Sequence, residues 1–326
     1  CIYMKNDLVV KDNALINASY SLGLVEQRLI LLAIVIIREH THNMALDYIA
    51  FNKPIEITAE SYINTFNVSH STAYESLKDA CKSLFSRQFS YQETRGKGIA
   101  HKTTRWVSDI AYIDNSATIE FTFAPAVLPL ITYLEKHLTS YELKQVANLT
   151  SGYAIRLYEL LIAWRSTGKT PLIDLYEFRS KLGIGDDKYQ RMGQLKEKVL
   201  HLAIEQINEH TDITVSYEQH KQGRNISGFS FRFKQKKSEK PSLKDQQNSN
   251  TVEFLSKLSD AQRHLFANKL SELPEMSKYS QGTESYPQFA VRIAEMLQDP
   301  ERIKEFSPYL IKVGYMPSSK KDTMNG

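Results

Sequence analysis

Two short, strongly basic segments carry the clearest chemical signal in the sequence. Five basic side chains stand against one acidic side chain between residues 87 and 105, and seven stand against one between residues 220 and 240. The whole chain has an excess of only +4. Cationic groups gathered on short segments bind phosphate oxygens, with an affinity that falls as salt rises. We therefore expect phosphate contacts from Lys221, Arg224, Arg95, Lys97 and Lys102.

A predicted helix with polar side chains in its first exposed turns precedes each basic segment. A helix fits the major groove of DNA, where Arg pairs well with guanine and Gln with adenine. The expected base-reading residues are Ser71, Thr72, Glu75 and Lys78 in the first helix, and Lys188, Gln190, Arg191, Gln194 and Lys198 in the second. Arg191 lies near the edge of the buried face, so an internal salt bridge is an alternative for it.

Other patterns imitate catalytic motifs but lack a necessary part. The end of a Walker A loop is imitated by Thr167-Gly-Lys-Thr170, but Ala163 stands where that loop needs glycine. The spacing of His40 and His42 suits a metal, yet the predicted polar loop around them does not fix both rings. Cys81 falls on a predicted buried stripe, as expected of a small core residue. We therefore expect a protein that is not an enzyme and has no metal and no cofactor.

Composition and length favour a globular protein of about two domains. The chain has 326 residues, of which 42% are hydrophobic and 24% charged. Two cysteines, Cys1 and Cys81, exclude a disulfide framework and every multi-cysteine zinc site. The longest apolar run covers residues 29–37 and is far shorter than the roughly 18 residues that cross a bilayer. With no charged region before an apolar stretch, we expect no secretory signal and a cytoplasmic location.

The candidate residues belong to an order of elements that occurs twice. Residues 61–68 align with residues 177–184, with aromatic, apolar, turn-forming and apolar positions in the same order. The first copy predicts helices over 24–38 and 59–66, a helix capped by Thr72 and Glu75, and strands over 55–58, 89–92, 103–107 and 118–123. The second predicts helices over 153–164, 175–182 and 187–209, and strands over 171–174, 213–217 and 229–233. This order is typical of a winged helix, and each basic segment falls on the hairpin of its copy.

The expected fold class is α+β, with two tandem winged-helix domains related by an internal pseudo-repeat. The predicted boundaries are residues 1–130 and 131–237 for the two domains, and 238–251 for a polar linker. Residues 125–150 are expected to be helical connecting structure. Residues 252–326 have helical apolar spacing, which indicates either a small helical appendage or a tail that binds a partner, helical or disordered.

With the repeat and its basic hairpins in view, the chain resembles the plasmid replication initiators of the iteron-binding Rep family, of the RepB/RepE type. The resemblance covers about residues 5–237 and is carried by residues 8–18, 24–31, 149–161, 195–208 and 217–233. It includes Tyr153-Ala-Ile-Arg-Leu-Tyr-Glu-Leu160. No function is carried over to the stretch beyond Lys240.

The resemblance implies a bacterial protein associated with the plasmid or the nucleoid. It implies that monomers bind direct repeats, the iterons, in double-stranded plasmid origin DNA. Dimers formed through the N-terminal domain would bind an inverted repeat and repress the protein's own gene. Host replication initiator, replicative helicase and chaperones are the implied partners, and no membrane is expected. Two alternatives stay open: a winged-helix repressor without origin activity, and a metal-dependent enzyme that nicks the origin.

Overall fold

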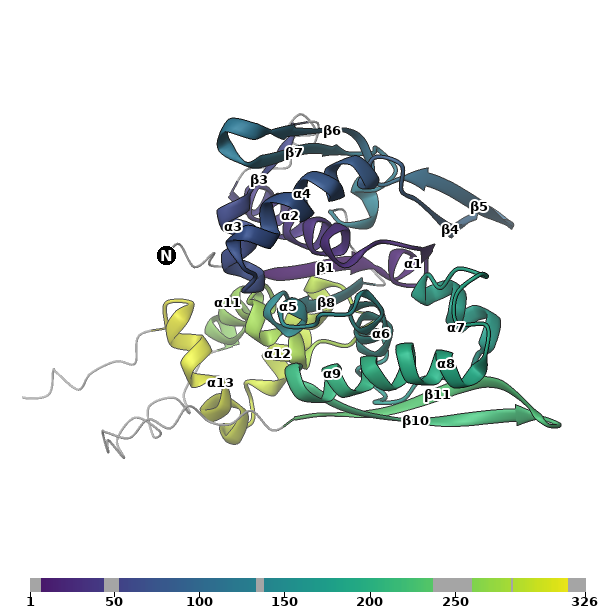
Figure 1. The fold of residues 1–326 in the computed structure, drawn as a ribbon. Helices are drawn as coiled ribbons and strands as arrows, with labels where there is room; N and C mark the ends of the chain where they lie inside the picture. The colour runs from purple at the N-terminus through teal and green to yellow at the C-terminus, as the bar shows by residue number, and fades with distance from the viewer. Residues whose placement is uncertain (1–6, 44–52, 133–137, 237–259, 283, 316–326) are drawn as a thin grey trace, which may run out of the picture.

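The computed structural model describes residues 7–43, 53–132, 138–236, 260–282 and 284–315 (Figure 1). Within these ranges the chain forms two units of mixed helix and strand, followed by a smaller helical unit. The apolar side chains of the first two units form one continuous core, and the helical unit has a core of its own. No helix in the described ranges is long and apolar enough to cross a membrane.

The first unit has the winged-helix order of elements. Its helices are α2 (Leu24–Asn43), α3 (Ala59–Phe66) and α4 (His70–Leu84), and its strands are β3 (Ile55–Thr58), β6 (Val107–Ile113) and β7 (Thr118–Phe123). The strands form an antiparallel sheet in the order β3-β7-β6, so that the wing is the hairpin β6–β7. A short turn, η2 (Asp114–Ser116), connects the two strands of the wing.

The second unit repeats this arrangement. Its helices are α6 (Gly152–Ile162) and α7 (Leu175–Leu182), then a continuous helical rod made of α8 (Met192–Leu195), η4 (Lys196–His201) and α9 (Leu202–His210). Its strands are β9 (Ile173–Asp174), β10 (Ile213–Gln222) and β11 (Asn225–Gln235), in the order β10-β11-β9. Because β3, β6 and β7 correspond to β9, β10 and β11, the two sheets confirm the predicted tandem winged helices.

Further elements connect and extend the units. The hairpin β4 (Gln88–Arg95) and β5 (Gly98–Arg105) pairs with β2 (Ser19–Tyr20) in a separate sheet. Strand β1 (Leu8–Asp12) pairs with β8 (Leu138–Glu142), and these two strands form a sheet of their own. The remaining short helices are α1 (Asn13–Ile16), η3 (Leu128–Leu130) and α5 (Lys144–Ala147).

Local signals explain the elements that the sequence predicts accurately. Helices α3 and α7 begin after Thr58 and Asp174, whose side chains accept hydrogen bonds from the backbone N–H three residues later. They end at Asn67 and Gly183, both in the left-handed conformation with φ of 49° and 70°. Position 183 requires glycine for a second reason: a Cβ there would lie 2.0 Å from the carbonyl oxygen of Tyr20 in the first unit.

Four local predictions are wrong. Helix α4 begins at His70 after Ser69, which places Thr72 inside the helix, so Thr72 and Glu75 form no capping box. The third helix of the second unit begins at Met192 rather than at residue 187, because Tyr189 has a φ of 50° that a helix does not allow. Strand β8 lies in the predicted helical connection, and α2 continues through the predicted loop at 39–43.

A buried ionic cluster joins the two units at α6. The carboxylate of Glu159 accepts hydrogen bonds from Lys11 on β1 (2.6 Å), Tyr141 on β8 (2.6 Å) and Arg156 on α6 (2.8 Å). Burial alone raises the pKa of Glu159, but these cations and hydrogen bonds outweigh it and hold the pKa below its ordinary value. All the charged members are almost completely buried.

The guanidinium of Arg156 extends this cluster to both units. Its Nη2 donates to the carbonyl oxygens of Ile16 (2.9 Å) and Ala18 (3.1 Å) in the first unit, and of Lys181 (3.0 Å) in the second. The guanidinium also lies 4.0 Å from the centre of the Tyr20 ring. Backbone of both units is therefore held by one side chain whose charge Glu159 balances.

The C-terminal unit is a folded helical body that packs on the rest of the chain. It consists of α11 (Asp260–Ser271), η5 (Pro274–Tyr279), α12 (Tyr286–Met296) and α13 (Pro300–Lys312). Tyr286 packs against apolar side chains of the β1–β8 sheet. Arg165, just beyond α6, donates to the carbonyl oxygen of Ser277 and to Ser280 Oγ (3.3 Å). The whole of the predicted linker, residues 238–251, lies outside the described residues.

Replacing the central carboxylate should destabilise the protein strongly. Glu159→Gln leaves Lys11 and Arg156 buried without a balancing charge, so we expect the free energy of unfolding to fall by about 3–5 kcal/mol in urea denaturation. The control is Glu177→Gln, which removes the partly exposed pair with Lys181 on one face of α7 and should cost less than about 1 kcal/mol. An equal loss of unfolding free energy in the two variants would contradict the role of Glu159 as the buried counter-charge.

Candidate nucleic-acid interface

The expected base-reading residues of the second unit gather around the start of its third helix. Gln194 and Lys198 lie on the helical rod, in α8 and η4, and Lys188, Gln190 and Arg191 lie in the turn before it. All five are exposed. The structure therefore corrects the position of three of them, which are turn residues rather than helix residues. Arg191 has no ion pair with any residue that the structure describes, so the alternative of an internal salt bridge is wrong.

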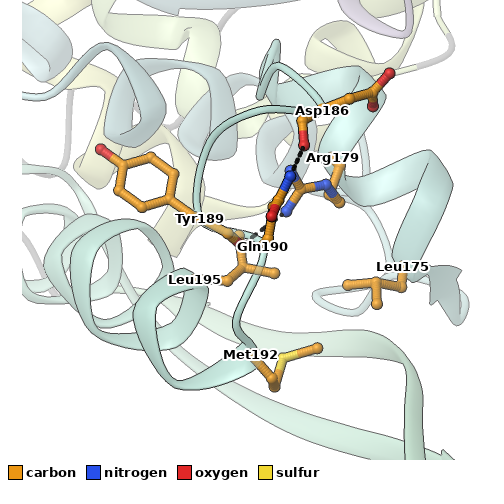
Figure 2. Close-up of a pocket in the computed structure, with 7 residues that line it drawn as sticks. All are labelled: Leu175, Arg179, Asp186, Tyr189, Gln190, Met192 and Leu195. Atoms are coloured by element: carbon orange, nitrogen blue, oxygen red, sulfur yellow. Dashed lines mark hydrogen bonds between the residues drawn. The ribbon is translucent and has the colours of Figure 1, made fainter.

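Arg179 on α7 holds this turn in shape. Its guanidinium donates to the carbonyl oxygens of Gly185 (2.9 Å), Lys188 (2.6 Å) and Tyr189 (3.1 Å). Figure 2 shows Arg179 beside Tyr189 in this turn. These bonds fix the backbone on either side of Tyr189, whose left-handed conformation is strained for a side chain of that size. Sequence reasoning missed Arg179, because a basic residue in the last turn of a helix is normally explained by its favourable interaction with the helix dipole.

The helical rod is locally widened just after its first turn. Residues Lys196–His201 form a π-helical segment between α8 and α9, a feature frequent at functional sites. Lys198 lies on this segment and pairs with Glu197 at 2.8 Å. The hydrogen bond with Glu197 raises the pKa of Lys198, which therefore stays protonated at neutral pH. To bind a phosphate or a base, Lys198 must leave this exposed partner.

The wing of the second unit is long, narrow and basic. Its strands pair from Ile213 and Gln235 at the base to Gln222 and Asn225 at the tip, well beyond the predicted strand ends. Gly223, with φ of 63°, forms the turn, as predicted. Residues 213–235 include four basic side chains and one acidic side chain. Lys221 and Arg224 are exposed at the tip.

The expected base-reading residues of the first unit share the exposed face of α4, but Lys78 has a partner. Ser71, Thr72 and Glu75 are exposed in the first turns of the helix. Lys78 pairs with Asp114 in the turn of the wing at 2.8 Å, and this hydrogen bond raises the pKa of Lys78. The wing itself, residues 107–123, includes three acidic side chains and no basic one.

The basic hairpin of the first unit is not its wing. Strands β4 and β5 pair with β2, whereas the wing strands β6 and β7 pair with β3. The expectation that the two basic segments occupy equivalent places in the repeat is therefore wrong. Arg95 and Lys97 are exposed near the β4–β5 turn, and Lys102 pairs with Glu93 at 2.6 Å. In the view of Figure 1, the tips of β4–β5 and β10–β11 extend toward the same side of the molecule.

Residues that could support other chemistry do not form a site within the described ranges. Cys81 is buried, and burial raises the pKa of its thiol, which makes it a poor nucleophile. Thr170 exchanges hydrogen bonds with Phe231 on β11, so the Walker-like segment completes a sheet edge. No group of three or more His, Cys, Asp or Glu side chains in the described part of the chain is arranged to hold a metal.

Two winged helices in sequence, with basic and polar residues on exposed hairpins and helix starts, define a tandem winged-helix protein. Residues 8–162 match the family model described as "Initiator Replication protein, WH1", and residues 174–233 match the model described as "Initiator Rep protein, WH2". The chain therefore belongs to the family of initiator replication proteins, as its resemblance predicts. The helical unit at 260–315 lies beyond both matches.

The chain is similar to several known proteins. A replication initiation protein of Escherichia coli is 24% identical over 214 residues, which cover 64% of this chain and 65% of that protein, just under two thirds of its length. The crystal structure of the Pi initiator protein in complex with iteron DNA is 22% identical, with a TM-score of 0.51, and covers 70% of this chain and 97% of that chain. The WH1 domain of MSBI1.176, a replication protein isolated from a multiple sclerosis patient, is 58% identical over 35% of this chain and 81% of that chain, with a TM-score of 0.29.

Proposed function

We propose that the protein initiates plasmid replication by binding repeated sites in double-stranded origin DNA. The observation that carries this proposal is the second unit, where five exposed polar side chains surround the start of one helix beside a basic wing. The E. coli relative is a replication initiation protein, and the Pi initiator, which has a similar fold, was crystallised with iteron DNA. Both relatives support the proposal.

The geometry of the second unit supports a proposal for how it reads bases. The start of the helical rod enters the major groove, where Gln190 and Gln194 are suited to adenine, and Arg191 to guanine. Lys188 and Lys198 flank them. The wing lies alongside, and Lys221 and Arg224 at its tip contact phosphates and set the register of the helix on the duplex.

The first unit contributes a second contact. We assign its phosphate contacts to Arg95, Lys97 and Lys102 on β4–β5, because its acidic wing repels the DNA backbone. Base reading by Ser71, Thr72, Glu75 and Lys78 on α4 stays a prediction, and for Lys78 it requires release from Asp114. Two reading helices in one chain would occupy successive major grooves, about 34 Å apart.

Family membership supports a proposal for the assembly states and partners. Monomers would bind the iterons, and dimers formed through the N-terminal domain would bind an inverted repeat and repress the gene. Binding to an array of sites would bend the duplex and open a flexible neighbouring segment. Host initiator, replicative helicase and chaperones are the proposed partners, in the bacterial cytoplasm on the plasmid or nucleoid.

A footprint on the DNA that flanks the gene tests the proposal as a whole. We expect protection of several direct repeats, each spanning two successive major grooves, by hydroxyl-radical cleavage. Protection of a single palindrome, with no direct repeats, would instead indicate a repressor without origin activity. Relaxed plasmid with protein covalently attached, after incubation with Mg²⁺ or Mn²⁺, would indicate a nicking enzyme.

Removing a base-reading side chain should change sequence preference. Gln194→Ala and Arg191→Ala should each relax the preference at one base pair by about 1–3 kcal/mol, because one pair of hydrogen bonds to a base edge is lost. Competition binding with all four base pairs at each position measures this. Gln298→Ala, an exposed change beyond α12, is the control and should leave every preference unaltered.

Removing a wing cation should weaken binding without changing preference. Lys221→Ala or Arg224→Ala should lower the affinity for all sequences alike and reduce the slope of log K against log salt by about one, because one fewer counterion is released. Lys304→Ala on α13 serves as the control. A change of preference at a single base pair in the wing variants would reverse our placement of helix and wing.

A further inference from the structure

A notch opens between the second and third helices of the second unit, beside the residues proposed to read bases. It has a volume of about 230 Å³ and is lined by Leu175, Arg179, Asp186, Tyr189, Gln190, Met192 and Leu195. Figure 2 shows Leu175, from the start of α7, and Met192, from the start of α8, pointing toward one another across the opening. Leu195 is buried behind them.

The polar groups around the notch are already engaged with the protein. Three backbone carbonyl oxygens accept hydrogen bonds from the terminal nitrogens of Arg179. The amide nitrogen of Gln190 donates to the carbonyl oxygen of Asp186 at 3.2 Å. The carboxylate of Asp186 is exposed at the rim and repels anions. The notch is therefore not built to take a phosphate.

Apart from the second N–H and the oxygen of the Gln190 amide, what remains for a ligand is apolar surface that the free protein leaves partly exposed. Leu175 and Met192 are both partly buried, and Met192 is the first residue of the helix that we place in the major groove. Among the base edges in that groove, the apolar group is the C5-methyl of thymine. Methionine is flexible and polarizable, so its side chain can close around a small group of this kind.

We propose that this notch recognises the C5-methyl group of one thymine in the binding site. The proposal rests on the DNA-binding function proposed above and adds a hydrophobic contact to the hydrogen bonds of Gln190 and Gln194. Leu175 and Met192 form the two walls, and Leu195 forms the floor. Arg179 is a positioning residue, because it holds the turn that carries Gln190 against the notch.

The size of the effect follows from the removal of one methyl group from water. Burying one such group contributes about 0.8 kcal/mol, which corresponds to about a fourfold change in affinity. Deoxyuridine differs from thymidine by this methyl alone and keeps the same hydrogen-bonding groups. A thymine that occupies the notch is therefore identified by a loss of affinity of about threefold to fivefold when deoxyuridine replaces it.

The test combines a scan of the DNA with variants of the protein. Each thymine of the protected site is replaced in turn by deoxyuridine, and the affinity of the full-length protein is measured by fluorescence anisotropy. We expect the loss at one thymine within the footprint of the second unit. In the Met192→Ala variant the same replacement should leave the affinity for DNA unchanged, whereas the Met192→Leu variant should still lose affinity. Leu265→Ala, an exposed change on α11, is the control and should behave as the unaltered protein.

The outcomes separate this inference from the proposed function. Sequence-specific binding without a loss of affinity at any replaced thymine would overturn only the proposal for the notch. A loss of affinity that persists in Met192→Ala would do the same. Absence of sequence-specific binding by the unaltered protein would overturn the proposed function as well. If Met192→Ala does not fold, Leu175→Ala takes its place, and the scan with unaltered protein decides the question independently of any variant.

Discussion

The placement of the two winged helices depends on one buried carboxylate. Glu159 forms ion pairs with both Lys11 and Arg156, and Arg156 in turn binds backbone carbonyls of both units. Ion pairs this deeply buried contribute little net stability, but removal of one member leaves a charge that the interior cannot solvate. The cluster therefore acts through geometry. It joins the backbone of the first unit, at Ile16 and Ala18, to the backbone of the second unit, at Lys181. The C-terminal unit packs on the adjoining β1–β8 sheet and on Arg165, so it supports the same junction.

Two copies of one fold carry opposite charge on equivalent hairpins. The wing of the second unit is basic and that of the first is acidic, although their strands have the same order in their sheets. The first unit instead places its basic residues on β4–β5, a hairpin without a counterpart among the strands described in the second. A fold therefore does not determine which of its loops faces DNA, because the same order of strands is compatible with different surface charges. The proposed division follows the charge: base reading and phosphate contact in the second unit, and phosphate contact through the additional hairpin in the first.

The turn before the third helix of the second unit concentrates the unusual features of the molecule. Tyr189 has a left-handed backbone, and the Arg179 guanidinium donates hydrogen bonds to three carbonyl oxygens. The helix that follows widens at η4. Strained conformations persist where the surroundings determine them fully, and they gather at functional sites. The same contacts that fix Lys188, Gln190 and Arg191 on the surface leave the apolar notch open between them and α7. A rigid turn loses little entropy on binding, which favours discrimination between bases.

The sequence alone determined the elements whose signals are local. Strand β3 and helices α3 and α7 lie at the predicted residues, because alternation, an N-cap side chain and a left-handed Asn67 or Gly183 act within a few positions. The repeat and the two basic segments were also readable, and they predict tandem winged helices that contact phosphates. The family was predicted from the resemblance of residues 8–18, 24–31, 149–161, 195–208 and 217–233. Only the tertiary structure decided which hairpin is the wing, that β8 pairs with β1 from 130 residues away, and that the reading helix begins at Met192. The strand pairings join residues far apart in the chain, and Arg179 reaches three carbonyl groups six, nine and ten residues away. Neither kind of contact leaves a periodic pattern in the residues that make it.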